Sequence, residues 1–375
     1  MPLRRPRARD LGIRIGRLEP GEHNAITDVP GVRVGHTTLI SGEGPLRVGT
    51  GPVRTGVTVV LPHDGDVWTE PVFAGSHRLN GNGELTGLEW IREAGLLAGG
   101  IGLTNTHSVG VVHDALIEAA IRAGRPENDF WSLPVVGETY DGALNDINGF
   151  HVRPEHLHAA LAAASGGPVA EGNVGGGTGM ICHEFKGGIG TSSRRVGDGW
   201  TLGVLVQANY GRRELLRIDG VPVGAAIGRE TVPSAWDQVE SLPPRQGPEG
   251  GSIIAIVGTD APLLPHQCER VAQRVTLGLG RLGSIASNSS GDIFLAFATG
   301  NRGLGDGGRT VGLQMVTDQA IDPLFEATVE ATEEAVVNAL LAAETLTGRD
   351  GVTAYALDPA QVVEVMRAHG RLTGV

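Results

Sequence analysis

The sequence predicts a layered α/β fold in which β-sheets stack face to face and helices cover the outer faces. Two kinds of segment indicate it: short, nearly continuous apolar runs typical of buried strands, and longer runs with one apolar stripe typical of helices packed on a sheet. The 59 glycines and 21 prolines are spread through apolar segments, so many short elements and tight turns are expected.

The predicted strands are short, partly β-branched and bounded by Gly, Pro or Asn. They cover residues 56–62, 101–105, 201–211, 252–257 and 292–300.

Five helices are predicted between and after these strands. The first opens with a capping box formed by Thr86 and Glu89. The fourth and fifth open with the pairs Asp322-Pro323 and Asp358-Pro359, because Asp favours the N-cap and Pro the first helical position. The helices cover residues 86–97, 109–123, 267–279, 322–346 and the segment after 358.

One strong break in composition divides the chain, the turn-rich run LPPRQGPEGG at residues 242–251. It separates pieces of 251 and 124 residues, and neither piece can bury its own apolar runs without partners from the other. We therefore expect one layered domain over residues 1–375, cut by a surface loop into a large chain (1–251) and a small chain (252–375).

Bulk properties exclude several classes of protein. A net charge of −12 argues against nucleic-acid binding, and no apolar run is long enough to span a membrane. No leader peptide is visible and there are only two cysteines, Cys182 and Cys268, so a reduced, cytoplasmic protein without a disulfide framework is expected. The basic residues at 4–9 are interpreted as a frayed terminus.

Metal and cofactor use is not expected. His107 and His113 are six residues apart, which matches neither a helical nor a strand metal pair, and no carboxylate completes a set. Lys186 is the only lysine, so it is the one position where a lysine could act as a general base.

The most informative residues are Gly251 and Ser252, where the turn-rich run meets an apolar strand. The Ser252 hydroxyl can attack the Gly251 carbonyl, move the acyl group from nitrogen to oxygen, and leave a new N-terminal serine after hydrolysis. Gly251 has no Cβ to hinder the attack and tolerates a strained backbone. The product carries a hydroxyl and an α-amine of pKa about 7.7–8.0, which suits a base near neutral pH. Taken alone, such a pair is more often a linker that meets a strand.

Three further polar residues lie at strand ends. Ser290 and Asp292 are two apart before a predicted strand, so both can point at a third group, although such residues usually cap a turn. Asn209 ends an apolar strand, where Asn is poorly suited. It is either a turn residue or an amide donor directed into a site.

Two loops are open to a functional and a structural interpretation. The segment 137–146 contains Glu138, Tyr140, Asp141 and Asp146, and by itself it reads as a solvated turn. The glycine-rich run 171–179 resembles a phosphate-binding loop. It lacks the Lys-Ser/Thr pair and a clear strand–loop–helix context, so close backbone packing around a site is favoured over nucleotide binding.

Together these motifs resemble the DmpA-type aminopeptidases, the L-aminopeptidase/D-esterase and β-aminopeptidase group of self-processing serine enzymes. The resemblance covers nearly the whole chain in order. It is carried by ITDVPGVRVGHTT (26–38), GLTNTHSVGVVHDAL (102–116), VVGETYDGALNDINGFHV (135–152), EGNVGGGTGM (171–180), VLVQANYGRR (204–213), GGSIIAIVGTDAPLLPHQ (250–267) and SNSSGDIFLAFATGN (287–301).

This resemblance implies a four-layer αββα sandwich, similar in arrangement to the N-terminal-nucleophile hydrolases but differently connected. It also implies a homo-oligomer, a tetramer of processed heterodimers. The substrate it implies is a small peptide, amino-acid amide or ester, with D- or β-residues accepted in the family.

The resemblance also implies roles for individual residues. Ser252 would be the nucleophile of self-cleavage and of turnover, and Asn209 would donate to the oxyanion. Ser290 and Asp292 would complete a cluster around the Ser252 hydroxyl and its new amine; some members have glutamate at the position of Asp292, one methylene longer. Glu138 would face the amino terminus of the substrate. Tyr140, tryptophan in some relatives, would line the pocket.

Two alternatives remain open from the sequence. An acyltransferase like the self-processing ornithine acetyltransferases would pass the acyl group to an amine, but those enzymes use threonine where this chain has Ser252. A non-catalytic nucleotide-binding module would use the run 171–179.

Overall fold

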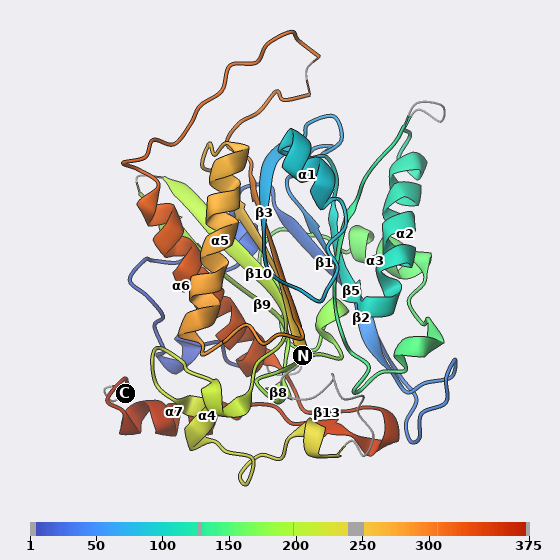
Figure 1. Cartoon of the computed structure of the whole chain (residues 1–375), viewed down its shortest axis with the longest axis vertical. Helices are drawn as coiled ribbons and strands as arrows, with labels where there is room; N and C mark the ends of the chain where they lie inside the picture. The colour runs from blue at the N-terminus through green and yellow to red at the C-terminus, as the bar shows by residue number, and fades with distance from the viewer. Residues whose placement is uncertain (1–4, 126–129, 198, 239–250, 306, 373–375) are drawn as a thin grey trace.

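Two β-sheets lie face to face at the centre of the structure, and helices cover both outer faces (Figure 1). The computed structural model describes residues 5–125, 130–197, 199–238, 251–305 and 307–372. The layers follow the order helix, sheet, sheet, helix, so the predicted α/β class and the four-layer αββα sandwich are confirmed. Most of the predicted run 242–251 lies outside the described residues.

The larger sheet holds the predicted cleavage site. Its strand order is β4-β3-β12-β11-β10-β9. These strands are β3 (Val72–Gly81), β4 (Leu96–Leu97), β9 (Gly188–Val196), β10 (Trp200–Asn209), β11 (Gly251–Thr259) and β12 (Ser290–Ala298). Strand β11 lies between β10, to which it is antiparallel, and β12, to which it is parallel. Residues that follow Gly251 therefore form central strands of a sheet whose other strands precede it.

The smaller sheet has the order β1-β2-β5-β6. Its strands are β1 (Arg33–Ser41), β2 (Val53–Leu61), β5 (Ile101–Asn105) and β6 (Val135–Thr139). Two short hairpins pair β7 (Ile181–Cys182) with β8 (Phe185–Lys186) and β13 (Leu346–Thr347) with β14 (Thr353–Ala354). The α-helices are α1 (Leu88–Ala94), α2 (Val109–Arg122), α3 (Pro154–Ala162), α4 (Val223–Ala226), α5 (Pro265–Arg281), α6 (Asp322–Ala342) and α7 (Pro359–Ala368).

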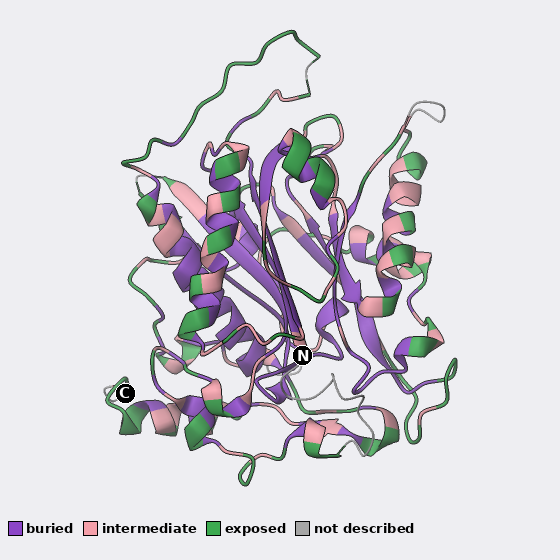
Figure 2. Ribbon diagram, viewed as in Figure 1, coloured by how far each residue is buried: buried purple, intermediate pink, exposed green. Residues whose placement is uncertain are grey.

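Side chains of β11 alternate between two apolar layers. Ile254 and Ile256 pack between the two sheets with Leu103 of β5, whereas Ile253 and Ala255 pack under α5 and α6. All of these side chains are buried, and Figure 2 shows the strands of both sheets as the buried centre of the molecule. Because β11 is covered on both faces, its position in the sheet is strongly specified.

Three boundaries of two predicted helices are wrong. Thr86 does not cap α1: its hydroxyl donates to the Pro134 carbonyl, and the helix starts only after Gly87, which has a left-handed backbone (φ 74°). The expected last residues of the first helix, 96–97, form strand β4 instead. Helix α6 ends at Ala342 rather than near residue 346, where strand β13 begins. At the ends of both helices, the residues expected to be helical form a strand instead, so strand pairing overrides local helix propensity.

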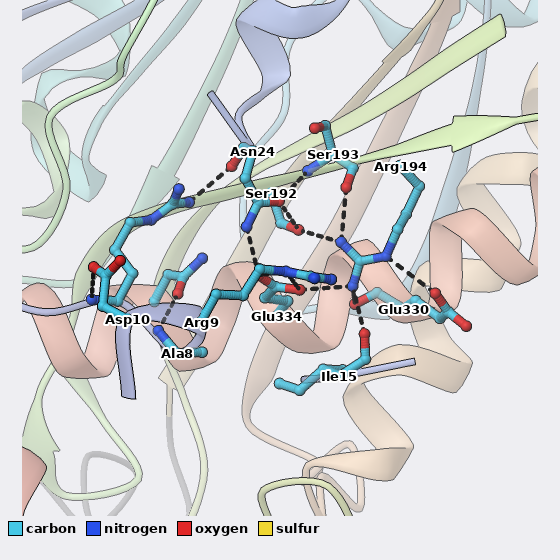
Figure 3. Close-up of polar contacts among 12 residues, drawn as sticks. Ala8, Arg9, Asp10, Ile15, Asn24, Ser192, Ser193, Arg194, Glu330 and Glu334 are labelled. Atoms are coloured by element: carbon cyan, nitrogen blue, oxygen red, sulfur yellow. Dashed lines mark hydrogen bonds and ion pairs between the residues drawn. The ribbon is translucent and has the colours of Figure 1, made fainter. Parts of the chain in front are cut away.

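The N-terminal segment is not frayed from Arg5 onward, contrary to the sequence-based expectation. Arg9 donates to Glu334 of α6 at 2.9 Å, and Figure 3 shows the neighbouring Arg194 of β9 between Glu330 and Glu334. Arg194, Glu330 and Glu334 are almost completely buried, so removing one of these charges would leave its partners buried and unpaired at a large energetic cost. This network joins α6, which follows the cleavage site, to two segments that precede it.

Candidate active site

Ser252 lies at the start of the central strand β11, beside the carbonyl group that self-cleavage would attack. Its Oγ donates to the Gly251 carbonyl oxygen at 2.7 Å and accepts from the Gly291 N–H at 3.2 Å. The Ser252 side chain is only 6% exposed. A buried hydroxyl held by backbone groups on both sides keeps one orientation, which is what a nucleophile needs.

No side chain fits at Gly251. Its backbone has a φ of 151°, and a Cβ placed there would lie 2.4 Å from the Asn209 carbonyl oxygen and 2.9 Å from the Tyr210 Cα. These atoms belong to backbone, so they cannot rotate away. The glycine that sequence reasoning linked to easy attack is thus also required by packing against β10.

Asn209 is the direct neighbour of Ser252 across the antiparallel pair β10–β11. Opposite residues in such a pair have Cβ atoms about 4.5–5.5 Å apart on one face of the sheet. The Asn209 Oδ1 accepts from the Ile181 N–H at 2.7 Å, and its Nδ2 donates to the Tyr140 carbonyl at 3.0 Å. These two bonds orient the amide and leave one Nδ2 hydrogen for another acceptor.

Ser290 and Asp292 contact each other as the two-residue spacing suggests. The Ser290 hydroxyl donates to Asp292 Oδ1 at 2.6 Å, and Asn80 of β3 donates to Oδ2 at 3.2 Å. Burial raises the pKa of Asp292, while the hydrogen bonds from Ser290 and Asn80 lower it. Asn80 was not found from the sequence, because β3 was not predicted and a lone Asn carries no signal.

The uncut chain does not join this pair to the Ser252 hydroxyl. In the parallel register Ser290 lies opposite Gly251, and Gly291 lies opposite Ser252. Side chains alternate between the two faces of a sheet along each strand. Ser290 and Asp292 therefore lie with Ile253 on the face that the helices cover, whereas Ser252 lies on the face between the two sheets. The Ser252 nitrogen lies in the plane of the sheet between these faces.

Glu138 and Tyr140 belong to a buried segment, so the solvated-turn interpretation of residues 137–146 is wrong. Glu138 is the penultimate residue of β6 and accepts hydrogen bonds from the Glu84 N–H at 3.0 Å and from the Thr106 hydroxyl. Burial raises the pKa of the Glu138 carboxyl. A Cβ placed on Gly83 would lie 3.2 Å from Glu138 Oε1 and 3.1 Å from the Gly291 Cα, so Glu138 lies close to the serine site.

Backbone packing explains the glycine-rich run 171–179, as the sequence analysis favoured. Gly175, Gly176 and Gly177 form a buried 3-10 turn. A Cβ on Gly176 would lie 2.1 Å from Gln207 Oε1, and one on Gly177 would lie 2.4 Å from the Ile189 nitrogen. The run packs on the two sheets and has no room at these positions for a phosphate.

The described residues show no group of three or more His, Cys, Asp or Glu side chains placed to hold a metal ion. Within the same ranges, no helix is long and apolar enough to cross a bilayer. Cys182 and Cys268 are buried and unpaired, as expected for small apolar residues.

Comparison with known proteins identifies the family. The profile of peptidase family S58 matches residues 24–354. This chain belongs to peptidase family S58. The β-peptidyl aminopeptidase of Sphingosinicella microcystinivorans is 49% identical over 373 residues, which cover 98% of this chain and 93% of that protein.

Two solved structures of aminopeptidases have the same fold. The β-aminopeptidase of Burkholderia sp. superposes with a TM-score of 0.89 at 53% identity, covering 98% of this chain and 100% of that one. The L-aminopeptidase D-Ala-esterase/amidase of Ochrobactrum anthropi, described as a variant of the Ntn hydrolase fold, superposes with a TM-score of 0.86 at 43% identity over the same shares. The family resemblance and the serine peptidase prediction are confirmed, and the acyltransferase and nucleotide-binding alternatives are not favoured.

Proposed function

We propose that this S58 member is a self-processing aminopeptidase whose nucleophile is Ser252. The observation that carries the proposal is the position of the Ser252 hydroxyl, 2.7 Å from the oxygen of the Gly251 carbonyl group and beside Asn209. Attack on the Gly251 carbonyl carbon forms an ester and releases the Ser252 amine. Water then hydrolyses the ester, which leaves chains 1–251 and 252–375 as two parts of one layered domain.

Turnover would reuse the same atoms. The Ser252 hydroxyl attacks the carbonyl of a substrate's N-terminal residue, the free Nδ2 hydrogen of Asn209 stabilises the tetrahedral oxyanion, and water releases the residue from the acyl-enzyme. The Ser252 amine is the nearest base to the hydroxyl. Ser290 and Asp292, on the other side of the sheet plane, would bond this amine once the Gly251 peptide bond is gone.

Glu138 and Tyr140 would bind the substrate. Glu138 lies near Gly291 and already accepts two hydrogen bonds, and each carboxylate oxygen retains capacity for an ammonium donor. A free amino terminus should therefore be required. Because the relatives include β-peptidyl aminopeptidases and an L-aminopeptidase D-Ala-esterase/amidase, we propose short peptides, amides and esters with small L-, D- or β-residues as substrates.

The proposal also covers the oligomeric state of the protein and the cellular compartment in which it works. The segment between β12 and α6 extends from the body as a long loop at the top of Figure 1, and its side chains Val311, Leu313 and Met315 are 47%, 45% and 54% exposed. Exposed apolar side chains on such a loop favour a homo-oligomer, with a tetramer of heterodimers as the proposed state. The unpaired cysteines fit a reducing, cytoplasmic setting.

Mass spectrometry of the intact protein tests the central claim. Wild-type protein should give two chains, the smaller beginning at Ser252, and Ser252→Ala should give one folded, inactive chain. A Ser252→Ala protein that is still cut after Gly251 would mean that another protease makes the break. For the substrate claim, Glu138→Gln should lose activity on a free aminoacyl p-nitroanilide, and wild type should not cleave the N-acetylated form.

A further inference from the structure

Lys186 is a buried cation without an acidic partner among the described residues. It is the only lysine in the chain, it ends strand β8, and it is completely buried. Its Nζ donates to the carbonyl oxygens of Met180 at 2.8 Å, Gly187 at 2.8 Å and Gly177 at 3.3 Å. Burying a charge is costly unless it is fully hydrogen-bonded, so a lysine here calls for a functional reason.

One of these carbonyls belongs to the peptide group that orients Asn209. The Met180 oxygen accepts from Lys186, and the nitrogen of the same peptide group, on Ile181, donates to Asn209 Oδ1 at 2.7 Å. A positive charge at the oxygen of a peptide group polarises its N–H and strengthens the bond that the N–H donates. These contacts form a continuous path from the Lys186 ammonium to the Asn209 amide.

The hairpin that carries Lys186 is strained and firmly held. Its two turn residues, His183 and Glu184, both have positive φ angles (47° and 63°), where glycine or asparagine is usual. The His183 N–H donates to the carbonyl of Tyr210, the residue after Asn209, and the Arg213 guanidinium lies 3.6 Å over the ring of Phe185. Figure 1 places β8 at the end of the large sheet where β10 finishes. Strain kept by such contacts is typical of residues that pre-organise a site.

We propose that Lys186 is a positioning residue for the oxyanion site: through the Met180–Ile181 peptide group it fixes and polarises the Asn209 amide beside Ser252. The inference rests on the proposed role of Asn209. Lys186 does not touch reacting atoms, so it acts only through Asn209. The ammonium has three donors for three carbonyl acceptors, whereas a neutral amine would direct a lone pair at one of them. This cage favours the charged form, although burial lowers the pKa of Lys186 to about 7.

A double-mutant cycle tests the proposal. Lys186→Met keeps the length of the side chain and removes the charge and all three donors. We expect kcat to fall on the order of 10- to 100-fold, while KM changes by less than about 3-fold. The loss in kcat should not exceed the loss caused by deleting an oxyanion donor. Self-cleavage should slow by a similar factor, because attack of the same Ser252 hydroxyl on the Gly251 carbonyl also forms a tetrahedral oxyanion. In an Asn209→Ala background, Lys186→Met should cost nothing more, because its effect passes through the missing amide.

Cys182→Ala is the matched control. Cys182 is completely buried in the same hairpin, and its side chain makes none of the hydrogen bonds that join Lys186 to Asn209, so its truncation should lower stability and keep those bonds. It should keep wild-type kcat. If Lys186→Met matures too slowly for turnover to be measured, the cycle is run on cleavage rates, and Lys186→Gln, which retains an amide donor, should give an intermediate rate.

The outcomes separate the two claims. If Asn209→Ala turns over at the wild-type rate, the proposed oxyanion role of Asn209 is wrong and the positioning role falls with it. If Asn209→Ala is slow but Lys186→Met has wild-type kcat, or lowers kcat equally in both backgrounds, only the positioning role is overturned. An effect confined to thermal stability would likewise make Lys186 a purely structural residue.

Discussion

Gly251→Ala should slow maturation while leaving the mature enzyme intact. The added Cβ would lie 2.4 Å from the Asn209 carbonyl oxygen, and ordinary contact begins at 3.4 Å, so the scissile residue must move by about 1 Å. A displacement of this size between reacting groups can cost about 100-fold in rate. Once the bond is cut, residue 251 is the end of the large chain, and Ser252 no longer depends on its geometry.

The assay follows conversion of full-length chain to the two products by mass spectrometry, and then measures kcat on an aminoacyl p-nitroanilide per mole of Ser252 chain. Gly251→Ala should mature about 100-fold more slowly, with kcat of the matured fraction within about 2-fold of wild type. Gly280→Ala is the control, because no atom lies within 4 Å of the place where its Cβ would stand. Maturation of Gly251→Ala at the wild-type rate would refute the reasoning about attack geometry. A low kcat in its matured fraction would show that Gly251 also serves turnover.

Three other predictions have distinct readouts. Ser290→Ala and Asp292→Asn should each slow maturation and turnover at least about 10-fold, because a charge-assisted hydrogen bond is lost; wild-type rates in both would leave the pair as a strand cap. Burial raises the pKa of Asp141 to about 7, so the folded state keeps this proton longer than the unfolded state and stability falls as pH rises from about 4 to 7. Over this range the free energy of unfolding should fall by at most about 4 kcal/mol, as measured by urea unfolding of the uncut Ser252→Ala chain. Adding Asp141→Asn to that chain should make the free energy of unfolding depend less on pH. The same pH dependence with and without Asp141→Asn would contradict the prediction. Leu313→Ser should shift the protein to smaller assemblies in light scattering, whereas Leu277→Ser, at an exposed position on α5, should not.

The fold class was predictable because buried strands have a strong sequence signal. All five predicted strands and the four later helices are present, and β11 and β12 are nearly continuous apolar runs. The longer strands β1, β3, β6 and β9 were missed, since threonine, serine, glycine and charged residues interrupt their apolar residues. In β9 the cause is visible: Arg194 sits in a core position where ion pairs with α6 replace apolar contacts.

The candidate site was predictable only where chemistry requires one residue type. A hydroxyl after a glycine and a carboxylate two residues from a serine can be recognised in a sequence, so Ser252, Ser290 and Asp292 could be named as candidates, and the family resemblance supplied their proposed roles. Asn80 and Lys186 were not linked to the site, because their importance arises from pairing and hairpin geometry that brings distant segments together. The face on which each side chain lies followed only from the strand register.

The position of the proposed cleavage site in the sheet would resolve a conflict between maturation and catalysis. A new chain terminus usually frays, whereas a nucleophile must be held within a fraction of an ångström. Here the proposed new terminus would begin β11, which pairs with β10 on one side and β12 on the other from its first residues. The neighbouring backbone also supplies the Gly291 N–H that already bonds the Ser252 hydroxyl in the uncut chain. The proposed cleavage would therefore free an amine without freeing the strand that carries it, and the sheet that folds the precursor would become the rigid support of the mature site.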